Sequence, residues 1–232
     1  MTPPTALVTG ASRGLGAALA EALNRRGWRL VVDGRDPDRL AAGVAALPRP
    51  DLVTAVAGDV ADPDHRAALA TAAGGSVDLL VNNASTLGPT PLPPLADLPP
   101  AALEDVLRTN TVAPLGLLQA LLPALERAGG TVVSVSSDAA VEAYEGWGGY
   151  GASKAALDRL SAVLAVEHPA LRVYAVDPGD MDTDMHRAAD PGATGLPAPA
   201  TVVPALLRLV DGDLPSGRYR AAELAVAAEA GR

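Results

Sequence analysis

Short apolar runs alternate with longer alanine-rich segments along most of this chain, and this alternation restricts its fold more than any other feature. The apolar runs are typical of strands and lie at residues 5–9, 29–33, 51–57, 77–81, 131–135 and 171–176. The segments between them are typical of helices and lie at 14–26, 38–46, 62–73, 101–127, 150–167 and 201–210. Strands without a polar face are buried on both sides, so the pattern indicates a doubly wound parallel sheet with helices on both faces. We expect one α/β domain over residues 1–232, with a last short strand and then a helical or frayed end in 216–232.

Composition excludes several classes of function. The 18 Lys and Arg residues against 27 Asp and Glu give a net charge of −9 without any basic cluster, which argues against nucleic acid as a partner. The chain has no cysteine, and His65, His168 and His186 lack the spacing of metal ligands, so we expect no disulfide and no metal. The N-terminus carries no secretory signal, and no apolar stretch approaches the roughly 20 residues that span a bilayer. We therefore expect a soluble, cytoplasmic protein with no membrane partner.

A glycine-rich turn, TGASRGLG, joins the first predicted strand to the first predicted helix. Glycine allows a backbone to turn sharply and to approach a phosphate closely, and a helix N-terminus offers free amides to the anion. An ordinary glycine turn remains the alternative, but the position between strand and helix favours phosphate binding. The residues that we expect to bind are Gly10, Ser12, Arg13, Gly14, Leu15 and Gly16.

Three further motifs follow in order: NNA at 82–84, a serine pair at 136–137, and YxxxK at 150–154. With the TGxxxGxG turn, they make the chain similar to the short-chain dehydrogenase/reductase family over roughly residues 5 to 185. The resemblance implies a Rossmann-like fold, an NAD(P)(H) cofactor, and hydride transfer between that cofactor and a small-molecule carbonyl or alcohol.

The resemblance assigns four catalytic residues. Tyr150 is the expected proton donor, and the ammonium of Lys154 is expected to lower its pKa from about 10. Ser137 is expected to hydrogen-bond the substrate oxygen, with Ser136 as the alternative. Asn110 is expected to hold a water that passes protons to the lysine.

The resemblance also assigns cofactor contacts outside the glycine turn. The NNA motif is expected to line the adenosine side, and Ser85 follows it where the family has glycine. Tyr150 and Lys154 are expected to contact the cofactor as well. The remaining expected contacts are Asp59, Val60, Asn83, Ala84, Pro178, Gly179 and Thr183; for Asp59 a plain surface carboxylate remains the alternative.

The end of the second predicted strand, VVDGRDP, bears on the choice of cofactor. A carboxylate there binds the ribose 2′-hydroxyl of NAD, whereas arginine accommodates the 2′-phosphate of NADP. By resemblance to the family, the discriminating carboxylate position falls on Gly34, and Arg35 and Arg13 match positions where NADP-dependent members carry basic residues, so we expect NADP(H). A shift of one residue would place Asp33 there and favour NAD(H) instead.

Two loops and the substrate are less constrained. The loop at 86–100 is expected at the rim of the domain, and the loop at about 180–200 is expected to bind substrate or act as a lid. Acidic residues near the site would favour a polar or cationic substrate if they line its pocket, and are otherwise solvated; they are Asp138, Glu142, Glu145, Asp180 and Asp182.

We expect a carbonyl reductase or alcohol dehydrogenase, with a catalytically silent nucleotide-sensing or scaffold protein as the alternative. By resemblance, helices 101–127 and 150–167 would pair copies into a homodimer or homotetramer.

Overall fold

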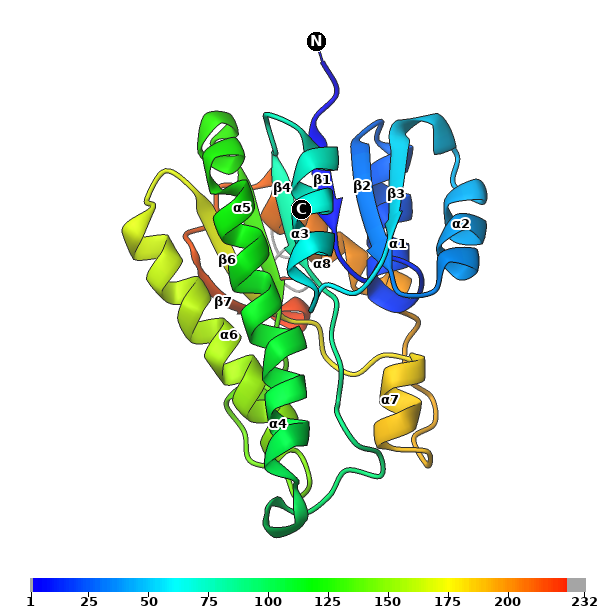
Figure 1. The fold of residues 1–232 in the computed structure, drawn as a ribbon, viewed down its shortest axis with the longest axis vertical. Coiled ribbons are helices and arrows are strands. Elements are labelled where there is room, and N and C mark those ends of the chain that lie inside the picture. Colours follow the sequence, from blue (N-terminus) through cyan, green and yellow to red (C-terminus); the bar gives the residue numbers. More distant parts are fainter. Residues whose placement is uncertain (1, 225–232) are drawn as a thin grey trace.

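A computed structural model describes residues 2–224 of the chain. These residues form a seven-stranded parallel sheet in the order β3-β2-β1-β4-β5-β6-β7 (Figure 1). The strands are β1 (Thr5–Val8), β2 (Arg29–Gly34), β3 (Val53–Ala57), β4 (Leu79–Asn82), β5 (Thr131–Val135), β6 (Arg172–Asp177) and β7 (Gly217–Arg220). The predicted doubly wound, Rossmann-like fold is confirmed.

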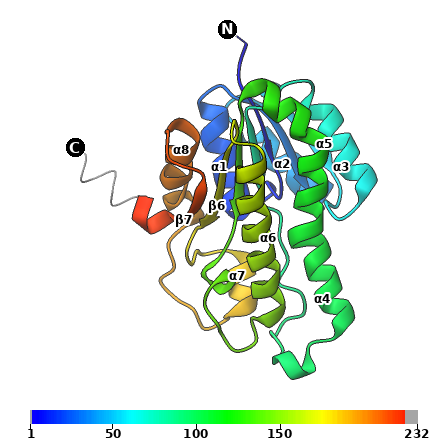
Figure 2. The same cartoon turned by 90° about the vertical axis from the view of Figure 1, so that its left-hand side faces the viewer.

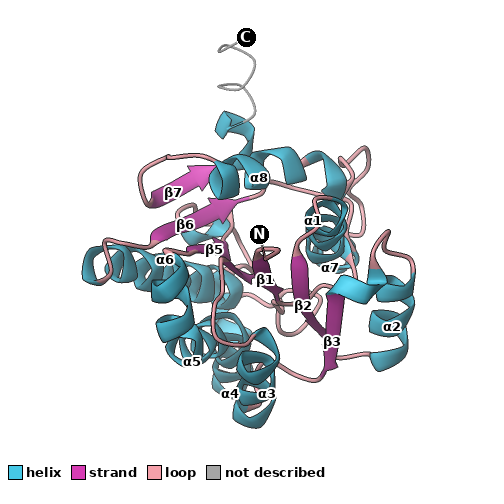
Figure 3. Cartoon of the chain, turned by 90° about the horizontal axis from the view of Figure 1, so that it is seen from above, coloured by secondary structure: helices cyan, strands magenta, loops and turns pink. Residues whose placement is uncertain are grey.

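Helices cover both faces of this sheet (Figures 2 and 3). One face packs against α1 (Gly14–Arg25), α2 (Pro37–Ala45) and α8 (Val203–Asp211), and the other against α3 (Pro63–Ala73), α5 (Ala113–Ala128) and α6 (Gly148–Glu167). Two shorter helices, α4 (Pro100–Leu107) and α7 (Asp184–Ala189), lie beyond the carboxyl ends of the strands. None of the helices described is long and apolar enough to cross a membrane.

The strand register explains the two cores. Leu7, Val31, Leu80, Val132 and Val173 are paired in one row across five strands and belong to the core under α3, α5 and α6. The residue that follows each of them in the chain belongs to the next row, and this second row is part of the core under α1 and α8. Because side chains alternate between the faces of a strand, a run of apolar residues supplies both layers at once.

Two predicted segments differ from the observed ones. A π-helical segment at Arg108–Val112 divides the single helix predicted at 101–127. The loop predicted at 180–200 contains α7. The expected last strand is β7, whereas the end of the chain at 225–232 lies outside the described residues.

Candidate active site

The candidate site is a crevice beyond the carboxyl ends of the strands, where β1 and β4 lie side by side. The chain moves from β1 toward one edge of the sheet and from β4 toward the other, and ligands bind at such switch points. The cavity there has a volume of about 1480 Å³. Of the predicted site residues, all but Gly16 and Asn110 line it.

The buried carboxylate of Asp33 holds the glycine turn through a backbone amide. The Gly10 amide donates to Asp33 Oδ1 at 2.5 Å, and the other oxygen of Asp33 lies 3.1 Å from His65 Nε2. A Cβ on Gly16 would lie 2.5 Å from the Gly10 oxygen and from the Asn83 side chain. Gly16 is therefore required for the close approach of α1 to the turn. Because Gly10 and Asn83 fill the space beside it, Gly16 does not face the cavity.

The start of α1 leaves its amides free for an anion. Arg13 is the N-cap residue, its side chain makes no capping hydrogen bond, and the first turn holds no acidic residue. By contrast, Asp36 and Asp62 cap α2 and α3 with their carboxylates. Orphan amides and the positive end of the helix dipole fit the phosphates of a dinucleotide.

The NNA motif holds the turn in place. The Asn83 side chain donates to the carbonyls of Thr9 and Gly10, at 2.8 and 3.1 Å. The Asn83 and Ala84 amides both donate to Thr9 Oγ1 at 3.0 Å. Thr9 was missed by the sequence analysis, because a threonine that ends an apolar strand carries no local signal of this role.

The end of β2 has no room for a discriminating carboxylate. A Cβ on Gly34 would lie 2.9 Å from Ser12 Cβ. Asp33 is buried, and its two carboxylate oxygens lie against the Gly10 amide and His65 Nε2. Arg35 is exposed at the cavity wall and makes no ion pair with any residue of 2–224. Of Asp33, Gly34 and Arg35, Arg35 is therefore the residue whose side chain is exposed at this wall.

The loop after β6 closes the crevice from the opposite side. The Gly179 amide donates to Asp177 Oδ1 at 2.9 Å, and the hydroxyl of Thr183 caps α7 by accepting from the His186 amide at 3.1 Å. The Thr183 methyl group would lie 3.6 Å from a Cβ on Gly14. The glycine turn and the start of α7 thus face each other closely across the crevice.

Tyr150 lies in the first turn of α6 with only 8% of its surface exposed, and its ring packs edge-on against Trp147. Burial raises the pKa of Tyr150 to about 12, although hydrogen bonding to the Ser137 and Ser85 hydroxyls opposes the rise. In the protein alone, desolvation of the phenolate is the largest influence on this pKa, and the expected lowering by Lys154 is not among its causes. A phenol that keeps its proton at neutral pH suits a general acid.

Lys154 is 1% exposed and follows Tyr150 by one helical turn. Its Nζ donates to the Val135 carbonyl at 2.7 Å and lies 5.6 Å from the centre of the Tyr150 ring. Burial lowers the pKa of Lys154 to about 8, with Asp158 opposing the change. The amine can therefore gain and lose a proton near neutral pH.

Asn110 lies at the centre of the π-helical segment and is fully buried. Its Nδ2 donates to the Thr86 carbonyl and to Ser153 Oγ, both at 2.9 Å, and its Oδ1 accepts from the Thr86 amide and the Ser85 hydroxyl. These four bonds saturate the side chain. A water held by Asn110 would have to bind its main-chain carbonyl, in the turn that the π geometry distorts.

The two serines after β5 have different surroundings. Ser136 is buried and its hydroxyl has no partner among the described residues. Ser137 donates to Asp138 Oδ1 at 2.9 Å and lies close enough to affect the Tyr150 phenol. Burial alone would raise the pKa of Asp138, but hydrogen bonds from Tyr144, Ser137 and a backbone amide lower it. This geometry favours Ser137 over Ser136.

Other predicted residues have simpler surroundings. Asp59 is exposed at the cavity wall and accepts from the Ala61 amide, and Val60 beside it is buried. Within residues 2–224, no three His, Cys, Asp or Glu side chains are grouped to hold a metal ion.

Comparison with known proteins places the chain in a family. The model of the family described as short chain dehydrogenase matches residues 4–193. Serine 3-dehydrogenase of Agrobacterium fabrum is 36% identical over 189 residues, covering 78% of this chain and 73% of the relative. Sepiapterin reductase of Mus musculus is 36% identical over 199 residues, covering 79% and 76%. A short chain dehydrogenase of Escherichia coli CFT073, solved with NADPH, has a TM-score of 0.87, 29% identity, and coverage of 95% and 97%. The chain belongs to the short-chain dehydrogenase family, as its motifs predict.

Proposed function

We propose that this oxidoreductase uses NADP(H) to interconvert a small ketone or aldehyde and the corresponding alcohol. The observation that carries the proposal is that Tyr150, Ser137 and Lys154 line the same cavity as the uncapped start of α1. A dinucleotide with its phosphates at α1 would reach from the end of β2 to Tyr150. The relatives are named as a dehydrogenase and as a reductase, the two directions of this chemistry.

The chain's own groups would handle the proton. The nicotinamide, when bound, supplies or accepts hydride at the substrate carbon. Tyr150, protonated at neutral pH, donates its proton to the substrate oxygen, and the Ser137 hydroxyl orients that oxygen. Lys154, whose pKa of about 8 lies near neutrality, supplies positive charge beside the phenolate. The main-chain carbonyl of Asn110 would hold the water that returns a proton to Lys154.

The preference for NADP(H) rests on the two arginines and on Asp33. Arg35 and Arg13 line the wall where the ribose of the adenosine would lie. Asp33 is buried and both of its oxygens already face protein groups, the Gly10 amide and His65, which leaves it less available to a 2′-hydroxyl than the exposed Arg35 is to a phosphate. The similar structure from Escherichia coli CFT073 was solved with NADPH. The rest of the cofactor would contact the other wall residues, Asp59, Val60, Asn83, Ala84, Pro178, Gly179 and Thr183.

The substrate and the assembly are proposed more broadly. Asp138, Asp180 and Asp182 line the cavity, whereas Glu142 and Glu145 lie outside its lining. Asp138 is occupied by hydrogen bonds from the protein, Asp182 is paired with Arg187, and Asp180 lies 3.5 Å from His186. We therefore propose no charge requirement for the substrate. A homodimer or homotetramer would pair copies through α5 and α6, where Val163 and Val166 are exposed on the surface of α6.

Fluorescence titration of the protein with NADPH and NADH in parallel, followed by a panel of carbonyl substrates, tests the proposal. We expect at least tenfold tighter binding of NADPH, equivalent to about 1.4 kcal/mol, and oxidation of NADPH with part of the panel. Tight binding without turnover on any carbonyl would favour the catalytically silent alternative. Binding of neither nucleotide would refute the proposed function.

A further inference from the structure

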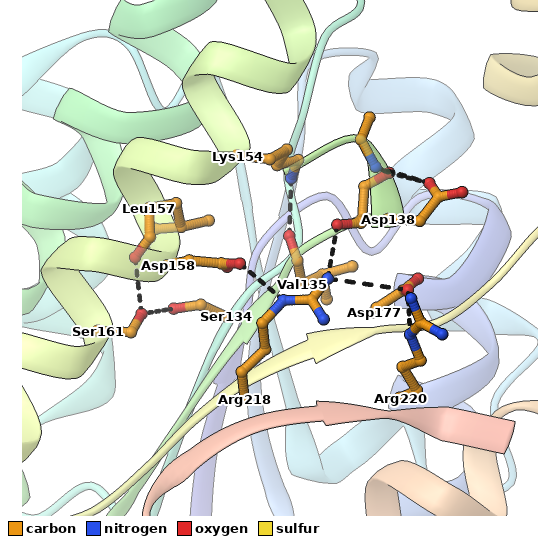
Figure 4. A network of polar contacts seen from close by, with 12 residues as sticks. Ser134, Val135, Asp138, Lys154, Leu157, Asp158, Ser161, Asp177, Arg218 and Arg220 are labelled. Atoms are coloured by element: carbon orange, nitrogen blue, oxygen red, sulfur yellow. Dashed lines mark hydrogen bonds and ion pairs between the residues drawn. The ribbon is translucent and has the colours of Figure 1, made fainter. Parts of the chain in front are cut away.

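Arg218 on β7 connects the last strand of the sheet to the catalytic end of the crevice (Figure 4). Its Nε donates to Asp158 Oδ2 on α6 at 2.9 Å, and its Nη2 donates to the Ser137 carbonyl at 2.9 Å. One guanidinium therefore holds the helix that carries Tyr150 and Lys154 and the backbone of the serine that faces them. The planar fork of arginine suits two such acceptors, whereas an ammonium concentrates its charge at one point.

The pair of Arg218 and Asp158 is largely shielded from water. The Arg218 and Asp158 side chains are 26% and 14% exposed. The second carboxylate oxygen, Asp158 Oδ1, is buried and has no hydrogen-bond partner among the described residues. Electrostatic interactions in such surroundings are stronger than at the surface, and removal of one partner leaves the other charge uncompensated.

Asp158 faces Lys154 along α6. The two residues are four positions apart and therefore lie on the same face of the helix. Burial lowers the pKa of Lys154, and the negative charge of Asp158 opposes that change. The positive guanidinium of Arg218 contacts the same carboxylate at 2.9 Å.

We propose that Arg218 and Asp158 are positioning residues of the active site, which fix the Ser137 backbone and set the net charge that faces Lys154. The proposal rests on the proposed function of Ser137 and Lys154, and nothing in the family's motifs includes either residue of the pair. Arg218 and Asp158 have no role in hydride transfer themselves; they act through the residues that they hold.

The other titratable groups near this end of the site are either neutral or already engaged by the protein. The charge that faces Lys154 is therefore best changed by substituting Arg218 or Asp158. Tyr150 on α6 is neutral at neutral pH because burial raises its pKa to about 12. Asp177 on β6 lies 3.8 Å from Arg218 and 3.9 Å from Arg220, so its carboxylate faces two cations. Asp138 after β5 accepts hydrogen bonds from Tyr144 and Ser137.

Lys154 is the only lysine of the chain, so its titration can be measured directly. Protein labelled with ¹³C at lysine Cε gives one lysine resonance, whose shift with pH reports the Lys154 pKa. Asp158→Asn should lower this pKa and Arg218→Gln should raise it, each on the order of one unit. The double variant, which removes both charges, should return close to the wild-type value.

Matched variants separate this effect from general loss of an ion pair. Arg26→Gln removes an exposed ion pair between the residue after α1 and Asp211 at the end of α8, neither of which lines the cavity, and should leave the resonance unchanged. Arg218→Lys keeps the charge but not the fork, so the pH profile of kcat should stay near wild type while KM for the carbonyl rises. Thermal unfolding of each variant identifies any that fails to fold; Asp158→Asn and Arg218→Gln each test the proposal alone.

Shifts of the Lys154 pKa in the same direction for both single variants, or no shift in a folded variant, would overturn the proposal. The NMR titration needs no substrate and no turnover. An enzyme without activity on any carbonyl would therefore refute the proposed function while the charge relationship of Lys154, Asp158 and Arg218 is still measured.

Discussion

Arg13 Nη1 lies 2.5 Å from Asp184 Oδ2, in an ion pair that joins the glycine turn to α7 across the crevice. Arg39 approaches the same carboxylate at 3.8 Å. Hydrogen bonds from Arg187 and then Arg13 lower the pKa of Asp184, so it is ionised at neutral pH. An anionic side chain of the protein thus occupies an arginine that we assign to the cofactor phosphate.

Asp184→Asn should therefore bind NADPH more tightly, because Arg13 is released and a negative charge near the phosphates is removed. Exposed ion pairs contribute up to about 1 kcal/mol, so we expect a gain of about fivefold at low salt that shrinks as ionic strength rises. Parallel fluorescence titrations measure it. Asp182→Asn is the matched control, since Asp182 pairs with Arg187 but not with Arg13. Weaker binding of NADPH to Asp184→Asn would show that the carboxylate helps to hold the cofactor.

Arg35→Ser should weaken binding of NADPH but not of NADH. The exposed guanidinium at the cavity wall is free of acidic partners in residues 2–224, so its charge is available to a 2′-phosphate. Loss of one charge-assisted contact is worth roughly 1.5–3 kcal/mol, or at least tenfold in the Kd of NADPH. Arg29→Ser, at the other end of β2, should change neither Kd. An equal loss for both nucleotides would place Arg35 outside the phosphate site.

Tyr150→Phe should reduce kcat by 100-fold or more, on the order expected for loss of a general acid, while the Kd of NADPH stays nearly constant. The phenyl ring keeps its contact with Trp147, so the fold should be maintained. Tyr219→Phe serves as the control, because within residues 2–224 the Tyr219 hydroxyl donates to the Pro215 carbonyl and to no other group. Steady-state assays of NADPH oxidation at saturating NADPH measure the loss of kcat. Full activity of Tyr150→Phe would contradict the assignment of the proton donor.

The sheet was predictable because local information decides it. Six apolar runs, each followed by an amphipathic segment, specify parallel strands whatever their neighbours are, and all six are present. The π-helical segment at Arg108–Val112 was not predictable, since one extra residue in a helical turn leaves the apolar periodicity almost unchanged. Helix α7 was missed because its six residues lie between stretches rich in proline and glycine, which favour a loop.

The candidate site was predictable only as far as its motifs reach. The sequence places Tyr150 and Lys154 one turn apart, but the direction of the Tyr150 pKa depends on burial, which is a property of the packed fold. Asp158 could have been noticed from its spacing to Lys154. Arg218 could not, because its contact with Asp158 joins residues 60 positions apart and depends on β7 lying next to β6.

The burial of Lys154 should make stability depend on pH. Its pKa is lowered from 10.5 in a solvated lysine to about 8 in the folded protein. Between these values the folded state has released a proton that the unfolded state still holds, so the free energy of unfolding should rise as pH increases from about 8 to about 10. Above pH 10 the raised pKa of Tyr150 acts with the opposite sign, because the unfolded tyrosine ionises first.

Lys154→Met removes the titrating amine from this environment and should abolish the rise, although it also loses the bond to the Val135 carbonyl. Urea unfolding of both proteins at several pH values from about 7 to about 10 measures their free energies of unfolding. As pH rises over this range, the free energy of unfolding of the wild type should increase relative to that of Lys154→Met by up to about 3 kcal/mol. Arg218→Gln, which we expect to raise the Lys154 pKa, should move the start of the rise to higher pH. If the stability of the wild type and of Lys154→Met changed in parallel with pH, the buried amine would have the pKa of an exposed lysine. Lys154 would then stay protonated near neutral pH and could not pass a proton on to Tyr150.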